Sequence, residues 1–149
     1  MITEATPYDI GQLGKLGKGF IDRSITGQFI SFNEEGFVNS LFKMLSLGVM
    51  KVWVYKDQNR ISGAIGLLMI PNLYNPLEML GDIAFVDVLP EYQKKGIARE
   101  LISLAEKFAK SVGIKSLTIS FKGDELVDIF CKSYGYCVLE HKLIKKVGD

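Results

Sequence analysis

The chain has 149 residues, 48% of them hydrophobic, and its 18 Lys and Arg against 17 Asp and Glu leave a formal charge of +1. This length predicts a single domain over residues 1–149 that buries a core of its own. The near-neutral charge argues against a nucleic-acid partner, and no apolar run approaches the roughly 20 residues that span a bilayer.

The cysteine and histidine content excludes two further classes. Cys131 and Cys137 are the only cysteines and His141 is the only histidine, so no ligand cluster at zinc spacing exists and we expect no metal site. Two isolated thiols fit a reducing compartment better than a disulfide scaffold. Because Glu4 and Asp9 interrupt the N-terminal segment, no signal peptide is expected either. These features predict a cytoplasmic protein.

The first half of the chain predicts two helices followed by a hairpin. Pro7 suits the first helical position and Asp9 the first turn, whereas four glycines between residues 11 and 19 weaken this helix. The glycines do not form a phosphate loop. The spacing from Gly11 to Gly17-Lys18 is one residue too long, and no Ser or Thr follows the lysine. The expected elements are a strand over 2–5, a helix from 7 to about 21, a loop over 23–32, a helix from 34 capped by Asn33, and hairpin strands over 49–55 and 61–70.

The second half alternates strands with helices. An amphipathic helix from Ile97 to near Gly113 follows the apolar strand 80–88, and a shorter helix capped by Asp124 is stopped by Gly135. The expected elements are a loop over 71–76, strands over 80–88 and 116–121, helices over 97–113 and 124–133, and terminal strands over 136–139 and 143–147. The predicted order is therefore β-α-α-β-β-β-α-β-α-β.

The segment Gln93–Ala98 joins the strand 80–88 to the helix that follows it. Helix N-termini carry unsatisfied N–H donors and a partial positive charge, so this junction suits a phosphate or pyrophosphate. Gly96 lets such a ligand approach the main chain, and Ala98 keeps the first helical turn slim. Lys94, Lys95 and Arg99 add positive charge. The alternative is an ordinary connection with a solvated lysine pair.

Neither the Walker loop nor the dinucleotide fingerprint fits this segment, because both need more glycines. The stretch Val88–Ala98 instead resembles the acyl-CoA pyrophosphate loop of the GCN5-related N-acetyltransferase (GNAT) family. The predicted element order also resembles that family over nearly the whole chain. The resemblance implies an α/β fold with a mixed, twisted central sheet flanked by helices.

The resemblance further implies direct transfer of an acetyl group from acetyl-CoA, the acyl-donor substrate, to a primary amine on a small molecule or a protein. The strand before the loop pairs through its main chain with the pantetheine arm, offers an N–H to the thioester oxygen, and often carries a bulge. Loop amides take the pyrophosphate. The cofactor-binding residues so implied are Val86, Asp87, Val88, Gln93, Lys94, Lys95, Gly96, Ile97, Ala98, Arg99 and Asp124.

An alkylamine is protonated at neutral pH, so a group must accept its proton. Asp82 matches the family's base position, and regular alternation along the strand puts it on one face with residues 84, 86 and 88. Glu78 is the reserve, and either carboxylate can act through a water. Asp87 should point to the opposite face, where a structural hydrogen-bonding role is expected. Asp82 as a plain strand-end or ion-pairing acid stays an alternative.

Residues 124–136 resemble a second signature of the family but differ from it at some positions. Asp124 stands where an asparagine often contacts the cofactor, and Cys131 stands where a tyrosine usually protonates the departing thiolate. Cys131 or the nearby Tyr134 can serve as the general acid, or no acid is used. Packing of Cys131 in the helix is the alternative interpretation. The segment 23–32 and the loop around Tyr74 are the expected acceptor-recognition surface.

Two other functions stay open. The missing tyrosine at position 131 suits a non-catalytic acyl-CoA-binding or regulatory protein of the same fold. A toxin or effector that acetylates a macromolecule is the third hypothesis, although the near-neutral charge argues against a tRNA substrate. The sequence does not decide the acceptor, the physiological role, or whether the chain forms a homodimer.

Overall fold

The computed structural model describes residues 1–121 and 124–148, except the side chains of Ile25 and Asp124. The chain divides into two compact units, Met1–Thr118 and Ile119–Asp149, and each is described by itself. Within the described ranges, every helix is too short or too polar to serve as a membrane span.

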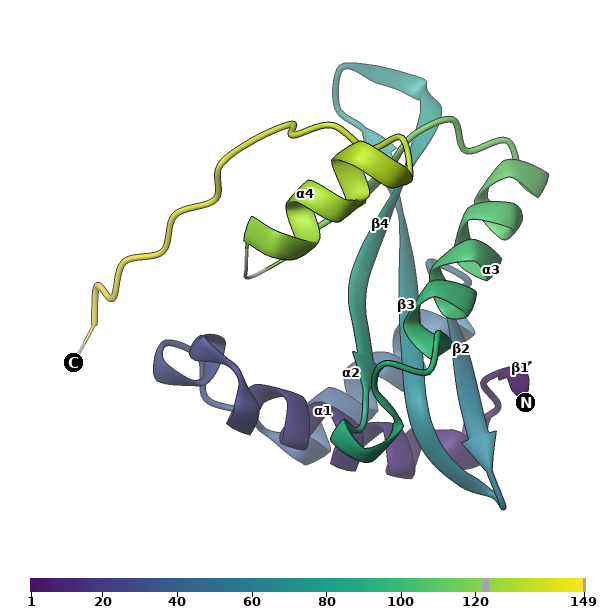
Figure 1. Ribbon diagram of the computed structural model, residues 1–149, viewed down its shortest axis with the longest axis vertical. Helices are drawn as coiled ribbons and strands as arrows, with labels where there is room; N and C mark the ends of the chain where they lie inside the picture. Colours follow the sequence, from purple (N-terminus) through teal and green to yellow (C-terminus); the bar gives the residue numbers. More distant parts are fainter. Residues whose placement is uncertain (122–123, 149) are drawn as a thin grey trace. The chain divides into compact units, whose positions relative to one another are not determined.

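A mixed five-stranded sheet organises the larger unit (Figure 1). Its spatial order follows the chain, and β1 to β4 are antiparallel neighbours. Strand β3 is buried over residues 61–67, which agrees with helices on both faces of the sheet. The strands are β1 (Ile2–Glu4), β2 (Met50–Asp57), β3 (Arg60–Asn72), β4 (Asn75–Val88) and β5 (Leu117–Ile119), the last lying at the boundary of the two units.

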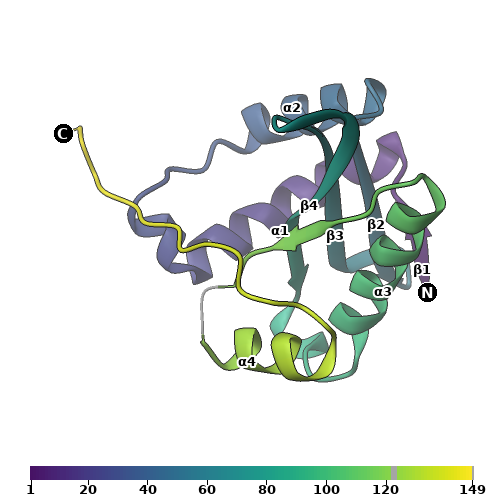
Figure 2. The same cartoon turned by 90° about the horizontal axis from the view of Figure 1, so that it is seen from above.

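Three helices cover this sheet, with α1 and α2 on one face and α3 on the other (Figure 2). Helix α2 begins as predicted, because the Asn33 side chain accepts a hydrogen bond from the Gly36 N–H at 2.8 Å. The elements are the 3-10 turn η1 (Pro7–Asp9), α1 (Ile10–Arg23), the 3-10 turn η2 (Ile25–Gln28), α2 (Glu34–Ser46), the 3-10 turn η3 (Pro90–Tyr92) and α3 (Ile97–Ser111).

Gly14 of α1 serves helix packing. A Cβ at Gly14 would lie 2.8 Å from Val38 Cγ2 of α2, so only glycine permits this approach of the two helices. The core beneath them includes Leu13, Leu41 and Val52, each at most 2% exposed. Close packing of the two helices over the sheet offsets the low helix propensity of glycine.

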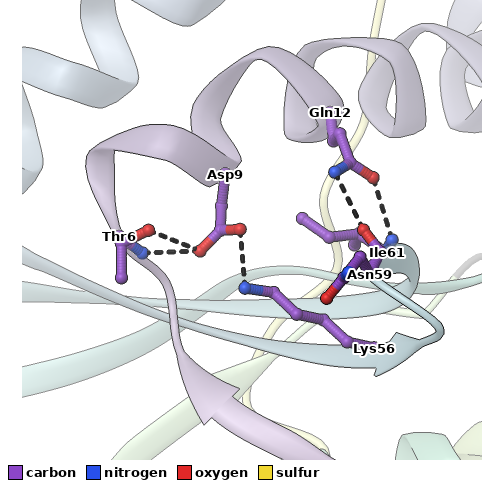
Figure 3. A network of polar contacts seen from close by, with 6 residues as sticks. All are labelled: Thr6, Asp9, Gln12, Lys56, Asn59 and Ile61. Carbon is purple, nitrogen blue, oxygen red and sulfur yellow. Dashed lines mark hydrogen bonds and ion pairs between the residues drawn. The ribbon is translucent and has the colours of Figure 1, made fainter.

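The turn between β2 and β3 has two residues, Gln58 and Asn59, both with positive φ (46° and 69°). This is the backbone of a tight hairpin turn that matches the twist of the strands. The side chain of Gln12, on α1, clasps the turn: its Nε2 donates to Asn59 O at 3.1 Å and its Oε1 accepts from Ile61 N at 3.0 Å (Figure 3). The turn is therefore fixed to α1.

A second contact in Figure 3 ties the start of α1 to β2. Asp9 is 4% exposed, and its carboxylate accepts from the N–H and hydroxyl of Thr6 at 2.8 and 2.9 Å and pairs with Lys56 Nζ at 2.7 Å. Burial alone raises the pKa of Asp9, but the hydrogen bonds from Lys56 and Thr6 outweigh it and hold the pKa below its ordinary 3.8.

The expected loop over residues 71–76 is wrong. Strands β3 and β4 continue to a turn at Leu73 and Tyr74, where Asn72 Oδ1 accepts from Tyr74 N at 3.0 Å. Asn75 Oδ1 likewise accepts from Leu77 N at 3.3 Å. These asparagine side chains satisfy the turn's amides, so the strands reach it despite the neighbouring prolines.

The smaller unit contains α4 (Asp124–Ser133), as predicted, with Phe130 buried. The Phe130 ring lies 4.6, 5.0 and 5.3 Å from the rings of Phe121, Tyr134 and Tyr136. Gly135 has φ 77°, and Tyr136 N donates back to Phe130 O at 3.2 Å, which ends the helix where glycine was expected to stop it.

The two terminal strands predicted over 136–139 and 143–147 are absent from the described residues, which carry neither helix nor strand from 134 to 148. Their alternating pattern provides β-propensity only, and a strand also needs a hydrogen-bonded neighbour. Leu143 and Val147 are 93% and 91% exposed. Strand β5 is likewise shorter than the predicted 116–121.

Candidate active site

A bulge in β4 sets the faces to which the Asp82 and Asp87 side chains point. Gly66 pairs with Phe85 but Leu67 pairs with Ile83, so Ala84 is an extra residue without a partner on β3. Side chains alternate regularly on either side of the bulge but change phase across it. The expected bulge is therefore present, and it lies two residues before Val86.

The bulge corrects the predicted face of Asp82. Asp82 pairs with Leu68 and Asp87 pairs with Ala64, and both partners belong to the core under α1 and α2. Asp82 and Asp87 consequently share the face that α1 and α2 cover. Val88 lies on the other face, where its methyl group neighbours the Ile97 side chain at Gly63. The expectation that Asp82 shares a face with residues 84, 86 and 88 is wrong.

Asp82 is half-buried and held by one partner. The Thr118 hydroxyl of β5 donates to Asp82 Oδ1 at 2.5 Å, and the nearby Gly81 N–H donates to Ser116 O at 3.1 Å. Glu78, the reserve base, pairs with Lys115 at 3.7 Å near the surface. Both carboxylates are thus placed along β4, and Asp82 has the more enclosed and better fixed position.

Asp87 makes the structural contact that was expected of its side chain. Arg23 Nη2, at the end of α1, lies 2.9 and 3.2 Å from the two Asp87 oxygens, and the Asp87 side chain is 12% exposed. Burial raises the pKa of Asp87 above its ordinary value, and the Arg23 charge and hydrogen bonds counter only part of that effect. The pair joins the end of α1 to the end of β4.

The segment between β4 and α3 adopts a special backbone conformation. Lys94 has φ 62° and Gly96, the N-cap of α3, has φ 83°. The Gln93 side chain turns back, and its Nε2 donates to Val88 O at 2.9 Å. A Cβ added at Gly96 would meet no atom within 4 Å, so the space beside its main chain is open. Residues 93–96 are called the anion loop below.

The anion loop leads into the first turn of α3. The first helical hydrogen bond of α3 runs from Glu100 N to Gly96 O at 3.0 Å, which leaves the amides of Ile97, Ala98 and Arg99 ahead of it. Ile97 is buried at 4% exposure and anchors this turn, whereas Lys94, Lys95 and Ala98 are exposed. Helix starts in general suit anions such as phosphate or pyrophosphate.

The candidate groups of the smaller unit lie on and just after α4. Cys131 is half-buried, and the Tyr134 ring is 38% exposed and packs against Phe130. The side chain of Asp124 lies outside what the structure describes. No group of three or more His, Cys, Asp or Glu within the described residues is arranged to hold a metal ion.

The two predicted acceptor-recognition segments have different shapes. A hollow of about 480 Å³ lies between the end of α1 and the segment up to Phe32, and it is lined mostly by polar side chains, among them Asp22, Ser24 and Gln28. Tyr74 lies at the tip of the β3–β4 hairpin and is 94% exposed. The first segment therefore forms a concave surface, and the second presents an exposed aromatic side chain.

These features can be compared with known proteins. The family model described as the acetyltransferase (GNAT) family matches residues 22–128, which is more than half of the chain. The chain belongs to the GNAT acetyltransferase family. The match includes β4, the anion loop and α3, and the predicted membership of this family is confirmed.

Solved GNAT structures share the fold across the whole chain. A predicted acetyltransferase with acetyl-CoA from Clostridium acetobutylicum has a TM-score of 0.78 at 17% identity, with 97% of this chain and 94% of that chain covered. Glucosamine-6-phosphate N-acetyltransferase from Arabidopsis thaliana has a TM-score of 0.72 at 18% identity, with 99% and 98% covered.

An aminoglycoside acetyltransferase from an uncultured soil metagenomic sample, in complex with sisomicin, has a TM-score of 0.71 at 21% identity, with 97% and 93% covered. Comparison with curated protein sequences gives no match. At these identities the solved structures establish the GNAT fold of this chain and leave its acceptor to be determined.

Sequence reasoning missed several side chains that support the candidate site. Thr118 supports Asp82, Arg23 supports Asp87, and Tyr92 donates to Asp57 Oδ2 at 2.7 Å. All three contacts join segments that are at least 35 residues apart, so no local periodicity reveals them.

Proposed function

We propose that this GNAT chain transfers an acetyl group from acetyl-CoA directly to a primary amine. The observation that carries the proposal is the anion loop, where Lys94 and Gly96 adopt positive φ directly before the first turn of α3. Positive φ at two nearby positions turns successive N–H groups toward one point, which suits the pyrophosphate of the coenzyme.

The proposed chemistry needs no covalent enzyme intermediate. The amine nitrogen attacks the thioester carbonyl carbon, a C–N bond forms, and the C–S bond breaks as the coenzyme thiolate leaves. In this proposal the main chain of Val86, Asp87 and Val88 pairs with the pantetheine arm. An N–H of the same strand stabilises the negative charge that develops on the carbonyl oxygen.

Asp82 is the proposed base, acting directly or through a water, with Glu78 in reserve. The Thr118 hydroxyl occupies Asp82 Oδ1, which leaves Oδ2 for a proton. Cys131 or Tyr134 is proposed to return a proton to the thiolate, unless the thiolate leaves without one, and Asp124 is proposed to contact the coenzyme. The GNAT relatives that bind sisomicin or act on glucosamine-6-phosphate support a small amine-bearing acceptor.

Two measurements test the proposal together. Acetyl-CoA at 100 times its Kd should stabilise the fold by about 2.7 kcal/mol and raise its Tm. An acceptor screen over aminoglycosides, amino sugars and lysine peptides, read by release of free thiol, should then find turnover. A Tm that saturating acetyl-CoA leaves unchanged contradicts the proposal. Binding without transfer to any acceptor favours the non-catalytic regulatory alternative, and transfer only to a macromolecule favours the effector alternative.

A further inference from the structure

The β2–β3 turn (Asp57–Arg60) contacts the segment that leads into the anion loop. Tyr92 Oη donates to Asp57 Oδ2 at 2.7 Å, and Arg60 Nη2 lies 3.1 Å from Glu91 Oε1. Both partners belong to η3, whose last residue directly precedes Gln93. Two side-chain contacts therefore connect a hairpin turn with the backbone that enters the anion loop.

The turn is a firm support, because α1 holds it from its other side. Gln12 bonds both to Asn59 O and to Ile61 N, and Lys56, next to Asp57, pairs with the buried Asp9 (Figure 3). These contacts hold both ends of the tight turn and leave it little conformational freedom. Asp57 is thus a fixed acceptor for the Tyr92 hydroxyl.

The Tyr92 ring also contacts the anion loop itself. Lys95 Nζ lies 5.2 Å from the centroid of this ring, within the range of a cation–π interaction. Lys95 stands between Lys94 and Gly96, the two residues with positive φ. A left-handed conformation at a lysine costs about 1 kcal/mol and persists only where surrounding contacts hold it. Tyr92 supplies such a contact to Lys95, the residue that follows Lys94.

We propose that Tyr92, fixed by Asp57, is a positioning residue that presets the anion loop for the pyrophosphate of the coenzyme. The inference rests on the proposed function, because Tyr92 would support the same coenzyme site. Tyr92 acts through the loop backbone and touches neither reacting atom. Its loss should therefore weaken coenzyme binding, while the chemical step of the bound complex stays the same.

The test compares Tyr92→Phe, Asp57→Ala and the double variant with the wild-type chain. Phenylalanine keeps the ring for Lys95 and removes only the hydroxyl. Calorimetry with CoA should give a Kd about three- to tenfold higher for each single variant. The double variant should show little increase beyond Tyr92→Phe, because both changes remove the Tyr92–Asp57 hydrogen bond, and only Tyr92→Phe also removes the contact of the hydroxyl with Ser62. Tyr8→Phe is the matched control, since Tyr8 is 93% exposed and lies in η1.

Hydrogen exchange of the free chain gives a second readout. The Gln93 amide, which donates to Pro90 O at 3.2 Å, should exchange faster in Tyr92→Phe than in the wild type, whereas urea unfolding should give nearly the same free energy. An unchanged Kd in both single variants overturns the inference, even if their unfolding free energy falls, because Tyr92 is then structural only. A wild-type chain that does not bind CoA overturns the proposed function, and this inference with it.

Discussion

Two backbone conformations at single residues decide what the candidate site can bind. Lys94 and Gly96 both have positive φ, yet only Gly96 lacks the Cβ that makes this region unfavourable. Space beside Gly96 is open, so a side chain there meets no protein atom. A substitution at Gly96 therefore acts through the backbone conformation and through the space that the ligand needs.

Gly96→Val should abolish detectable binding of acetyl-CoA while the fold is largely retained. A β-branched residue at φ 83° costs about 1–2 kcal/mol, and the relaxed loop no longer directs its amides to one point. Calorimetry and far-UV circular dichroism measure the two effects separately. Gly113→Val is the control: Gly113 also has positive φ, at the other end of α3. Equal losses of binding in both variants would contradict a specific role for Gly96.

Asp82→Asn should spare coenzyme binding and slow turnover by about 10²- to 10⁴-fold, the contribution typical of general base catalysis. Asparagine keeps an oxygen for the Thr118 hydroxyl, so the local structure is preserved. The measurement is kcat and the acetyl-CoA Kd across a range of pH. Normal turnover at every pH would show that Asp82 is not the base, and Glu78→Gln then tests the reserve.

Among the elements, α1 owes its placement to contacts at both ends. Asp9 precedes its first residue and pairs with Lys56 of β2, and Arg23, its last residue, pairs with Asp87 of β4. Both charges also suit the helix dipole, which favours an acid at the N-terminus and a base at the C-terminus. The helix is therefore aligned over the sheet by charge as well as by packing.

Arg23→Met should lower the free energy of unfolding at pH 7 by about 1–2 kcal/mol, because it leaves a buried carboxylate without its partner. The Asp87 pKa, already raised by burial, should rise further. A protonated Asp87 needs no cation, so the deficit should shrink as the pH falls toward 4. Urea unfolding at several pH values measures this trend. Lys18→Met, which removes the exposed Lys18–Asp22 pair, should have no measurable effect.

Sequence periodicity predicted the elements far better than their pairing. The anion loop and α3 could be located because a strand, a turn and an amphipathic helix follow one another locally. The face of the sheet on which Asp82 lies could not be predicted, because the bulge at Ala84 depends on pairing with β3. The terminal strands failed for the same reason: alternation in residues 136–147 encodes propensity, whereas a strand requires a partner.

Across the larger unit, the buried Asp9 and the half-buried Asp87 change the free energy of unfolding in opposite directions as the pH falls. The Asp9 pKa is lowered, so Asp9 contributes stability above its unfolded value of 3.8 and loses it as the pH falls through the folded pKa. The Asp87 pKa is raised, so its contribution becomes less favourable as the pH rises from 3.8 through the folded pKa. The pH dependence of the free energy of unfolding combines both effects.

Asp9→Asn should therefore change the acid limb of this profile. At pH 7 the variant should be less stable by about 1–2 kcal/mol, since Lys56 and Thr6 lose a charged acceptor. Below pH 3.8 the difference should shrink, because the wild-type carboxylate also becomes protonated there. Urea unfolding from pH 3 to 7 gives the comparison, with Asp22→Asn as the exposed control. A difference that stays constant over this range would mean that Asp9 acts by shape alone, and the ionic link between α1 and β2 would contribute nothing to stability.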